Sequence, residues 1–127
     1  MSDTHDVVRA RAFELIGPDD KVVAKLEYCA GALPGSSLWL AGPASGRIAL
    51  AVEGDKAEIR LLSRSGRARA SLTVRENDNG TKLLIRDNHE KVRVEMGTDP
   101  AGETFLTVYG KDGNTLWQIP PEHPPAN

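Results

Sequence analysis

The chain has 127 residues, of which 39 % are hydrophobic and 5 % aromatic, and its 16 basic and 18 acidic residues leave a net charge of −2. This length fits one domain with a modest core built on aliphatic side chains. The balanced charge argues against electrostatic attraction to nucleic acid or to an anionic membrane. Cys29 is the single cysteine, so no internal disulfide can form, which fits a reducing compartment.

The first segment, residues 1–6, is polar and acidic. It lacks the basic and apolar regions of a signal peptide, so we expect a flexible tail and a cytoplasmic location. No run of residues approaches the roughly 18 apolar residues of a membrane helix. An Arg-Ala-Arg-Ala motif occurs at 9–12 and again at 67–70, which suggests that the first strand begins near Val7.

A β-hairpin pattern then recurs five times along the chain. Each copy contains an alternating apolar stretch, a turn rich in Gly, Pro, Asp or Ser, and a second alternating stretch. The copies run over residues 13–26, 38–52, 59–72, 83–96 and 106–119. The first and last apolar residues are separated by 13 positions in every copy except the second, where the separation is 14. We therefore expect about ten short antiparallel strands.

Side-chain polarity alternates with a period of two, most clearly in the second strand of each copy. Ala24 and Leu26 alternate with Lys25 and Glu27, for example. Such alternation predicts strands with one buried face. It assigns further residues to the same apolar face, namely Val22, Tyr28, Ala68, Ala70, Leu72, Val74, Val92, Val94 and Met96.

The turns occupy equivalent positions in the five copies. Gly46, Gly66 and Gly113 stand six residues before the final apolar residue of their copies, while Asp20 and Glu90 replace glycine there. Glycine supplies a positive φ at low cost. We therefore expect the turns at Asp20 and Glu90 to differ in detail from the others.

The end of the chain, residues 120–127, contains four prolines. Proline has no N–H to donate to a strand ladder, so this segment should end the last strand and remain disordered. The predicted organisation is a tail over residues 1–6, one hairpin-repeat domain over residues 7–119, and a Pro-rich tail over residues 120–127.

Ten strands with one apolar face need a covering for that face. An open sheet would expose large apolar side chains, at about 1.5–3 kcal/mol each, and would leave two aggregation-prone edges. The expected fold is therefore all-β, closed as a barrel or folded as a sandwich, or completed by oligomerisation. Small residues such as Ala24, Ala68 and Ala70 favour close approach of sheets over a wide cavity.

The other face of the strands also contains apolar residues. Scattered exposed apolar residues are normal, whereas a continuous patch would mark an interaction surface. The residues proposed for such a surface are Ile16, Trp39, Leu62, Leu84, Tyr109 and Leu116.

No catalytic, metal or cofactor motif accompanies the repeat. His89 and the acidic residues Asp19, Asp20, Asp87 and Asp112 fall at turn positions, where local backbone hydrogen bonds explain them. The spacing of a calcium loop is missing, and no Gly-rich loop leads into a helix to bind phosphate. Cys29 is expected in a loop, Tyr-Cys-Ala-Gly-Ala, without a neighbouring base, so we interpret it as an ordinary thiol.

The pattern resembles bacterial hairpin repeats, namely the Tyr-Asp repeats of large toxin shells and the stacked hairpins of choline-binding repeats. The segment Tyr109-Gly-Lys-Asp-Gly113 comes closest to the Tyr-Asp form. The aromatic pairs that make choline sites are absent, so the resemblance carries no ligand with it.

These observations favour a non-enzymatic structural or protein-interaction module that self-associates through apolar β faces. Its expected partners are copies of itself or another protein, without nucleic acid, membrane or cofactor. The alternative is a β-barrel that binds a small ligand or glycan, with Trp39, Trp117 and Tyr109 as stacking platforms. That alternative requires at least two of these aromatic side chains to line one cavity.

Overall fold

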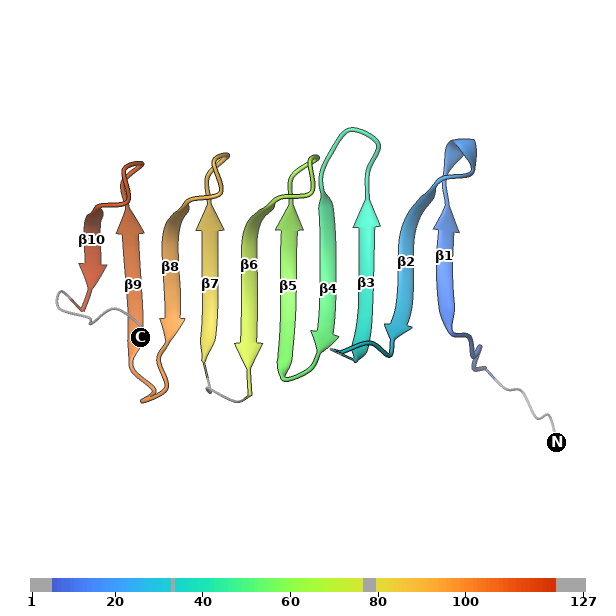
Figure 1. The fold of residues 1–127 in the computed structure, drawn as a ribbon, viewed down its shortest axis with the longest axis horizontal. Helices are drawn as coiled ribbons and strands as arrows, with labels where there is room; N and C mark the ends of the chain where they lie inside the picture. Colours follow the sequence, from blue (N-terminus) through green and yellow to red (C-terminus); the bar gives the residue numbers. More distant parts are fainter. Residues whose placement is uncertain (1–5, 33, 77–79, 121–127) are drawn as a thin grey trace.

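The protein is a single ten-stranded antiparallel sheet in which each strand pairs with its neighbours in sequence (Figure 1). The computed structural model describes residues 6–32, 34–76 and 80–120. The first five strands are β1 (Ala12–Ile16), β2 (Val22–Cys29), β3 (Gly35–Ala41), β4 (Arg47–Glu53) and β5 (Lys56–Leu62). The second five are β6 (Ala68–Arg75), β7 (Thr81–Arg86), β8 (Val92–Thr98), β9 (Thr104–Tyr109) and β10 (Thr115–Ile119). The expected all-β fold with ten antiparallel strands is confirmed.

The sheet is open rather than closed into a barrel. Strands β1 and β10 form its two edges, and they lie at opposite ends of the row of strands (Figure 1). β1 begins at Ala12, five residues later than the Arg-Ala repeat suggested. Apart from Asp6 and Pro120, the two predicted tails lie outside the described residues.

Four turns share one backbone geometry. In each turn, the first residue donates its N–H to the carbonyl of the residue four positions later. The fourth residue donates its N–H to the carbonyl of the first residue. That fourth residue has a positive φ, at Gly66 (87°), Glu90 (66°), Gly102 (84°) and Gly113 (86°). This is the three-residue hairpin loop that ends in a left-handed residue. The turn at Glu90 therefore matches the glycine turns, and our expectation of a difference there is wrong.

The first turn does differ, as expected. It contains a short 3-10 helix (Pro18–Asp20) in which both Asp19 (φ 65°) and Asp20 (φ 57°) are left-handed. Gly17 still donates its N–H to the Lys21 carbonyl at 2.8 Å, so the loop closes over the same number of residues. Aspartate tolerates this conformation better than most residues.

An irregularity in pairing follows the first turn and the turns at Gly66, Glu90 and Gly113, but not the turn at Gly102, and it changes the predicted faces. One extra residue is inserted in β2, β6, β8 and β10, namely Val23, Arg69, Arg93 and Leu116. Such β-bulges shift the alternation by one position. Val22, Ala68 and Val92 consequently pair with Ile16, Leu62 and Arg86, which occupy polar-face positions. The assignment of these three residues to the apolar face is wrong.

The sheet has almost no buried core. Among the described residues, the buried hydrophobic side chains are Ala24, Ala51 and Phe105, and no large side chain is fully buried. Phe105 of β9 is the large residue among these three, and it pairs with a glycine, Gly97 of the neighbouring strand β8. An aromatic residue that pairs with a glycine in the neighbouring strand is a known way to shield the glycine backbone in a sheet. One layer of strands cannot bury both of its faces, so this deficit follows from the architecture.

Candidate interaction surface

The strand register aligns the apolar residues into two rows that cross all ten strands. The upper rung, nearer the hairpin turns, consists of Leu15, Ala24, Leu40, Ile48, Leu61, Ala70, Ile85, Val94, Val108 and Trp117. The lower rung consists of Phe13, Leu26, Leu38, Leu50, Ile59, Leu72, Leu83, Met96, Leu106 and Ile119. Together these two rungs define the apolar face. Because side chains alternate along a strand, every intervening residue lies on the opposite, polar face.

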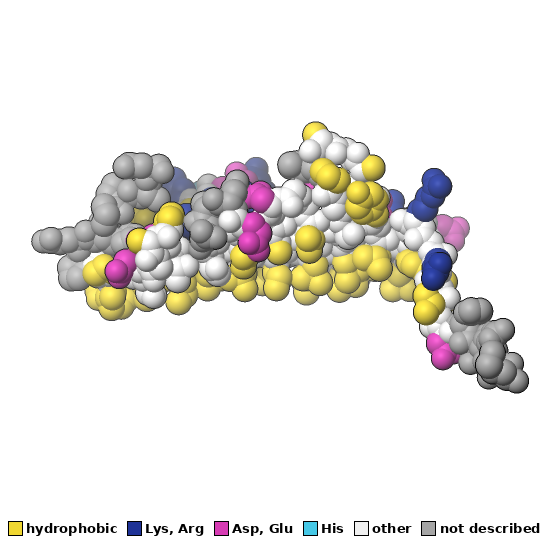
Figure 2. Space-filling model, turned by 90° about the horizontal axis from the view of Figure 1, so that it is seen from below, with side chains coloured by type: hydrophobic (Ala, Val, Ile, Leu, Met, Phe, Trp, Pro, Cys, Tyr) yellow, Lys and Arg dark blue, Asp and Glu magenta, His cyan; other side chains and the backbone are white. Residues whose placement is uncertain are grey.

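Most large side chains of the apolar face are exposed. Leu26, Ile59 and Leu72 retain 44 %, 45 % and 42 % of their accessible surface, and Trp117 retains 50 %. Figure 2 shows the hydrophobic side chains as a row along one side of the sheet. A contiguous apolar surface of this extent differs from the scattered exposure of ordinary protein surfaces, and surfaces of this kind typically belong to interaction sites.

The apolar face is not uniformly flat. A shallow hollow of about 450 Å³ opens over Ala24, between Leu15 of β1 and Leu40 of β3. It exists because Ala24 is the smallest side chain of the upper rung in that part of the sheet, while its neighbours are leucines. The Gly42–Gly46 loop between β3 and β4 forms its upper rim. A second, smaller hollow of about 260 Å³ lies lower on the face, beside Ala57 of β5.

Several charged side chains of the polar face form ion pairs and hydrogen bonds with one another. Glu58 accepts a hydrogen bond of 2.8 Å from the Thr73 hydroxyl, and its other carboxylate oxygen lies 3.0 Å from Arg60 Nε and 3.7 Å from Lys56 Nζ. Lys25 pairs with Glu27 at 3.2 Å. These pairs are partly exposed and individually weak, but they leave this face well matched to water.

A second polar cluster surrounds Glu95 of β8. The Tyr109 hydroxyl donates to the Glu95 carboxylate at 3.2 Å, and Lys82 Nζ lies 3.2 Å from the same carboxylate. Desolvation raises the pKa of Tyr109, and the nearby negative charge of Glu95 raises it further. The phenol therefore stays protonated and acts as a hydrogen-bond donor, which is a structural role.

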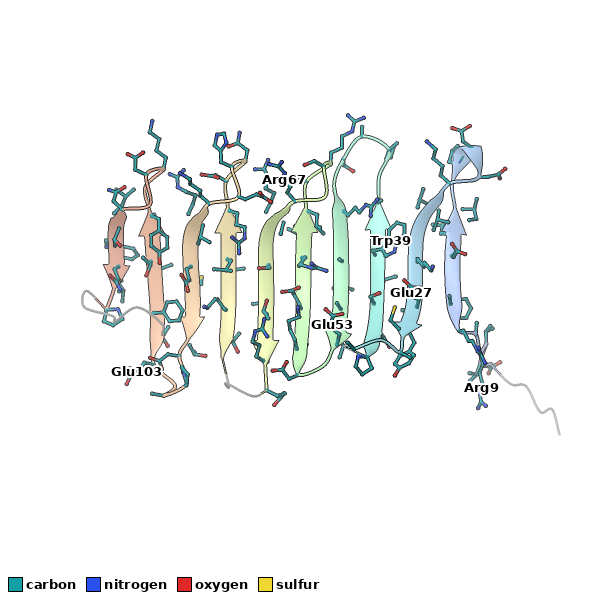
Figure 3. The ribbon with its side chains drawn as sticks, viewed as in Figure 1. Arg9, Glu27, Trp39, Glu53, Arg67 and Glu103 are labelled. Atoms are coloured by element: carbon teal, nitrogen blue, oxygen red, sulfur yellow. The ribbon has the colours of Figure 1, made fainter. Side chains whose placement is uncertain are left out.

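The six residues proposed from the sequence are spread over six strands. Trp39 and Leu84 lie on the polar face, separated by three intervening strands, and the guanidinium of Arg47 lies 5.1 Å from the Trp39 ring centre (Figure 3). Leu84 and Tyr109 are brought together around Glu95. Ile16 and Leu116 are exposed at the upper ends of the edge strands, and Leu62 ends β5. The structure does not join these residues into one patch.

The three aromatic residues of the ligand-binding alternative lie on different faces. Trp117 belongs to the apolar face, whereas Trp39 and Tyr109 lie on the polar face and four or more strands separate them. None of the three lines either hollow of the apolar face or the hollow of about 310 Å³ around Thr73 on the polar face. The arrangement provides no shared stacking platform among the described residues.

The candidate chemical residues occupy structural positions. His89 lies in an exposed turn and donates its backbone N–H to Asp87 Oδ1 at 2.8 Å. Cys29 is exposed at the end of β2, so it is part of a strand rather than of a loop. Within the part of the chain that the structure describes, no group of three potential metal ligands occurs.

No protein-family model matches the chain, and no curated protein is similar to it. Among the described residues, no helix has the length and apolar character needed to span a membrane.

The sequence contained the signal for the apolar face. Four of the five hairpin copies have the same apolar span, and equal spans place successive apolar residues at equal heights on neighbouring strands. Alternation alone assigns these residues to an interior, which leaves only the opposite face as a candidate interaction surface. The open sheet makes the supposed interior the exposed surface.

Proposed function

We propose that this protein is a non-enzymatic structural module that self-associates, with the apolar face as its contact surface. The observation that carries the proposal is the pair of unbroken apolar rungs across ten strands, whose large side chains stay exposed in a single chain. A second sheet laid on this face would complete a sandwich, which is one of the coverings expected from the sequence pattern.

The contrast between the two faces supports this assignment. Several charged side chains of the polar face pair with one another, as in the cluster around Glu58. The apolar face contains no charged side chain in either rung, so its burial removes no charged group from water. Burial of a large aliphatic side chain contributes about 1.5–3 kcal/mol, and this face offers many such side chains.

Self-association can be tested with two adjacent residues of β6 that point to opposite faces. Leu72 lies in the lower rung between Ile59 and Leu83, and Ser71 lies on the polar face between Arg60 and Leu84. Leu72→Glu would place a carboxylate in the contact, where desolvation costs several kcal/mol. Ser71→Glu adds the same charge beside Arg60, outside the contact.

Sedimentation velocity and light scattering at tens of micromolar measure the outcome. We expect an oligomer for the wild type and for Ser71→Glu, and at least a 100-fold weaker association for Leu72→Glu. Circular dichroism of each variant shows whether the sheet forms. A wild-type protein that stays monomeric across the concentration range contradicts the proposal, as does equal association of the two variants.

A further inference from the structure

The size of the apolar face fits a second copy of the chain as its occupant. At about 4.8 Å between strands and 3.3 Å per residue, ten strands of this length present roughly 950 Å² of face, so two copies would bury about 1,900 Å². Stable protein–protein interfaces bury about 1,200–2,000 Å² in total. A face related to itself by a two-fold axis forms an interface of this area without any further partner.

Two face-to-face arrangements are compatible with two-fold symmetry. If the axis runs along the strands, the order of strands reverses between the layers, so β1 lies over β10 of the second copy and rungs of equal height meet. If the axis runs across the strands, β1 lies over β1 and the upper rung meets the lower rung. The two arrangements bring different side chains into contact.

The upper rung contains a bulky end and a hollow end. Its largest side chain, Trp117, stands in β10 and is 50 % exposed. The hollow of about 450 Å³ over Ala24 lies in β2, next to the opposite edge of the sheet. This volume lies within the range of about 300–1,000 Å³ that holds small-molecule ligands, so it accommodates an indole ring.

Reversal of the strand order brings these two features together. Trp117 of the second copy then meets the upper rung at β1 and β2, within one strand spacing of Ala24, and the same contact repeats at the other edge. With β1 over β1, Trp117 would instead meet the bulky Ile119 of the second copy. Packing of large against small side chains gives the denser interface.

Resting on the self-association proposed above, we infer that two copies pack face to face with opposite strand order, and that Trp117 of each copy inserts into the hollow over Ala24 of the other. Ala24 and Trp117 are then the residues that determine the orientation and the specificity of the contact, while the aliphatic side chains between them provide its area.

Distances between spin labels separate the two arrangements. In a Cys29→Ser background, Glu14→Cys places one label on the polar face of edge strand β1, away from the contact. With opposite strand order the two labels lie at opposite edges, about 45 Å apart, whereas β1 over β1 brings them within about 25 Å. A label at Ser71→Cys near the centre of the sheet gives a short distance in both cases and serves as the control.

Complementary substitutions test the insertion itself. We expect Trp117→Ala to weaken the dimer at least tenfold, because it removes the side chain that inserts. We expect Ala24→Leu to weaken the dimer at least tenfold as well, because it fills the hollow. The double variant Ala24→Phe with Trp117→Ala places the large side chain at position 24 and the small one at position 117, so it should recover most of the affinity. Trp39→Ala removes a tryptophan from the polar face and should leave the dissociation constant unchanged. Circular dichroism confirms the sheet in each variant.

The outcomes are distinguishable. A long Glu14 label distance together with rescue by the exchanged pair supports the inference. A short distance, or no rescue, overturns the arrangement while self-association through the apolar face stands. A monomer overturns both, and a monomer that takes up an apolar dye in the hollow would identify a small ligand as the occupant.

Discussion

At the residue scale, the residue with a positive φ at the end of a hairpin loop determines how much backbone strain the turn contains. Glu90 occupies the position at which three equivalent turns contain glycine, with a φ of 66°. A side chain in this conformation costs roughly 1–2 kcal/mol. Its ion pair with Arg67, at 4.0 Å between two exposed groups, returns little of that cost.

We therefore predict that Glu90→Gly raises the free energy of unfolding by about 0.5–1 kcal/mol, since glycine relieves the strain but loses more chain entropy on folding. Urea denaturation measures this change. Glu90→Gln keeps the side chain and removes the charge, so it should leave stability unchanged. A gain in Glu90→Gln equal to that in Glu90→Gly would assign the effect to charge instead of to backbone conformation.

Asp87 makes the same turn sensitive to acid. Partial desolvation raises the pKa of Asp87, but N–H groups donated by His89 and Lys91 and the nearby Arg93 outweigh this effect, and the pKa lies below its ordinary value. A carboxylate with a lowered pKa in the folded state stabilises the fold above the unfolded-state pKa of about 3.9. That stabilisation disappears as the pH falls through the folded-state pKa.

The corresponding prediction concerns Asp87→Asn, which keeps an oxygen acceptor but cannot ionise. It should be less stable than the wild type at about pH 7, and the difference should close on acidification below about pH 4. Urea denaturation over this pH range follows the two curves. A difference that stays constant with pH would mean that the ionised carboxylate contributes nothing.

At the element scale, β7, β8 and β9 depend on one close approach. A side chain at Gly97 would bring its Cβ within 1.9 Å of the Thr81 carbonyl oxygen of β7, and Gly97 pairs with Phe105 of β9 in the strand on its other side. Gly97 is therefore required by packing between strands and not by a positive φ.

We predict that Gly97→Ala lowers the free energy of unfolding by about 1–3 kcal/mol, the range of substitutions that overpack a site. Gly31→Ala is the matched control, because no atom lies within 4 Å of the position its Cβ would take. Chemical denaturation of both variants checks the prediction. Equal free energies of unfolding for Gly97→Ala and Gly31→Ala would show that β7 and β8 can move apart at position 97 without loss of stability.

Strand positions and hairpin pairing were predictable from alternation and turn residues, but the faces were predictable only in part. Alternation assigned Ala24, Leu26 and Ala70 correctly. It failed at Val22 and Ala68 because a bulge shifts the period by one position. A bulge leaves no clear mark in the sequence, since its extra residue is Val23 in one strand and Arg69 in another.

At the scale of the whole molecule, the proposed self-association would couple the stability of the single layer to the protein concentration. A chain whose large apolar side chains become buried only in the oligomer gains stability by mass action. We predict that the melting temperature rises by a few degrees for each tenfold increase in protein concentration. Differential scanning calorimetry over two decades of concentration measures this, and Leu72→Glu should abolish the dependence. A melting temperature independent of concentration in the wild type would contradict it.

The sequence by itself determined the strands, the turns and the existence of one apolar face, because these depend on neighbours along the chain and on alternation with a period of two. Only the tertiary structure decided that the ten strands stay in one open layer and that the upper rung is hollow at Ala24 and bulky at Trp117. Closure depends on the accumulated twist between strands, and a hollow depends on side chains from three strands at once. Neither quantity is contained in any local stretch of residues.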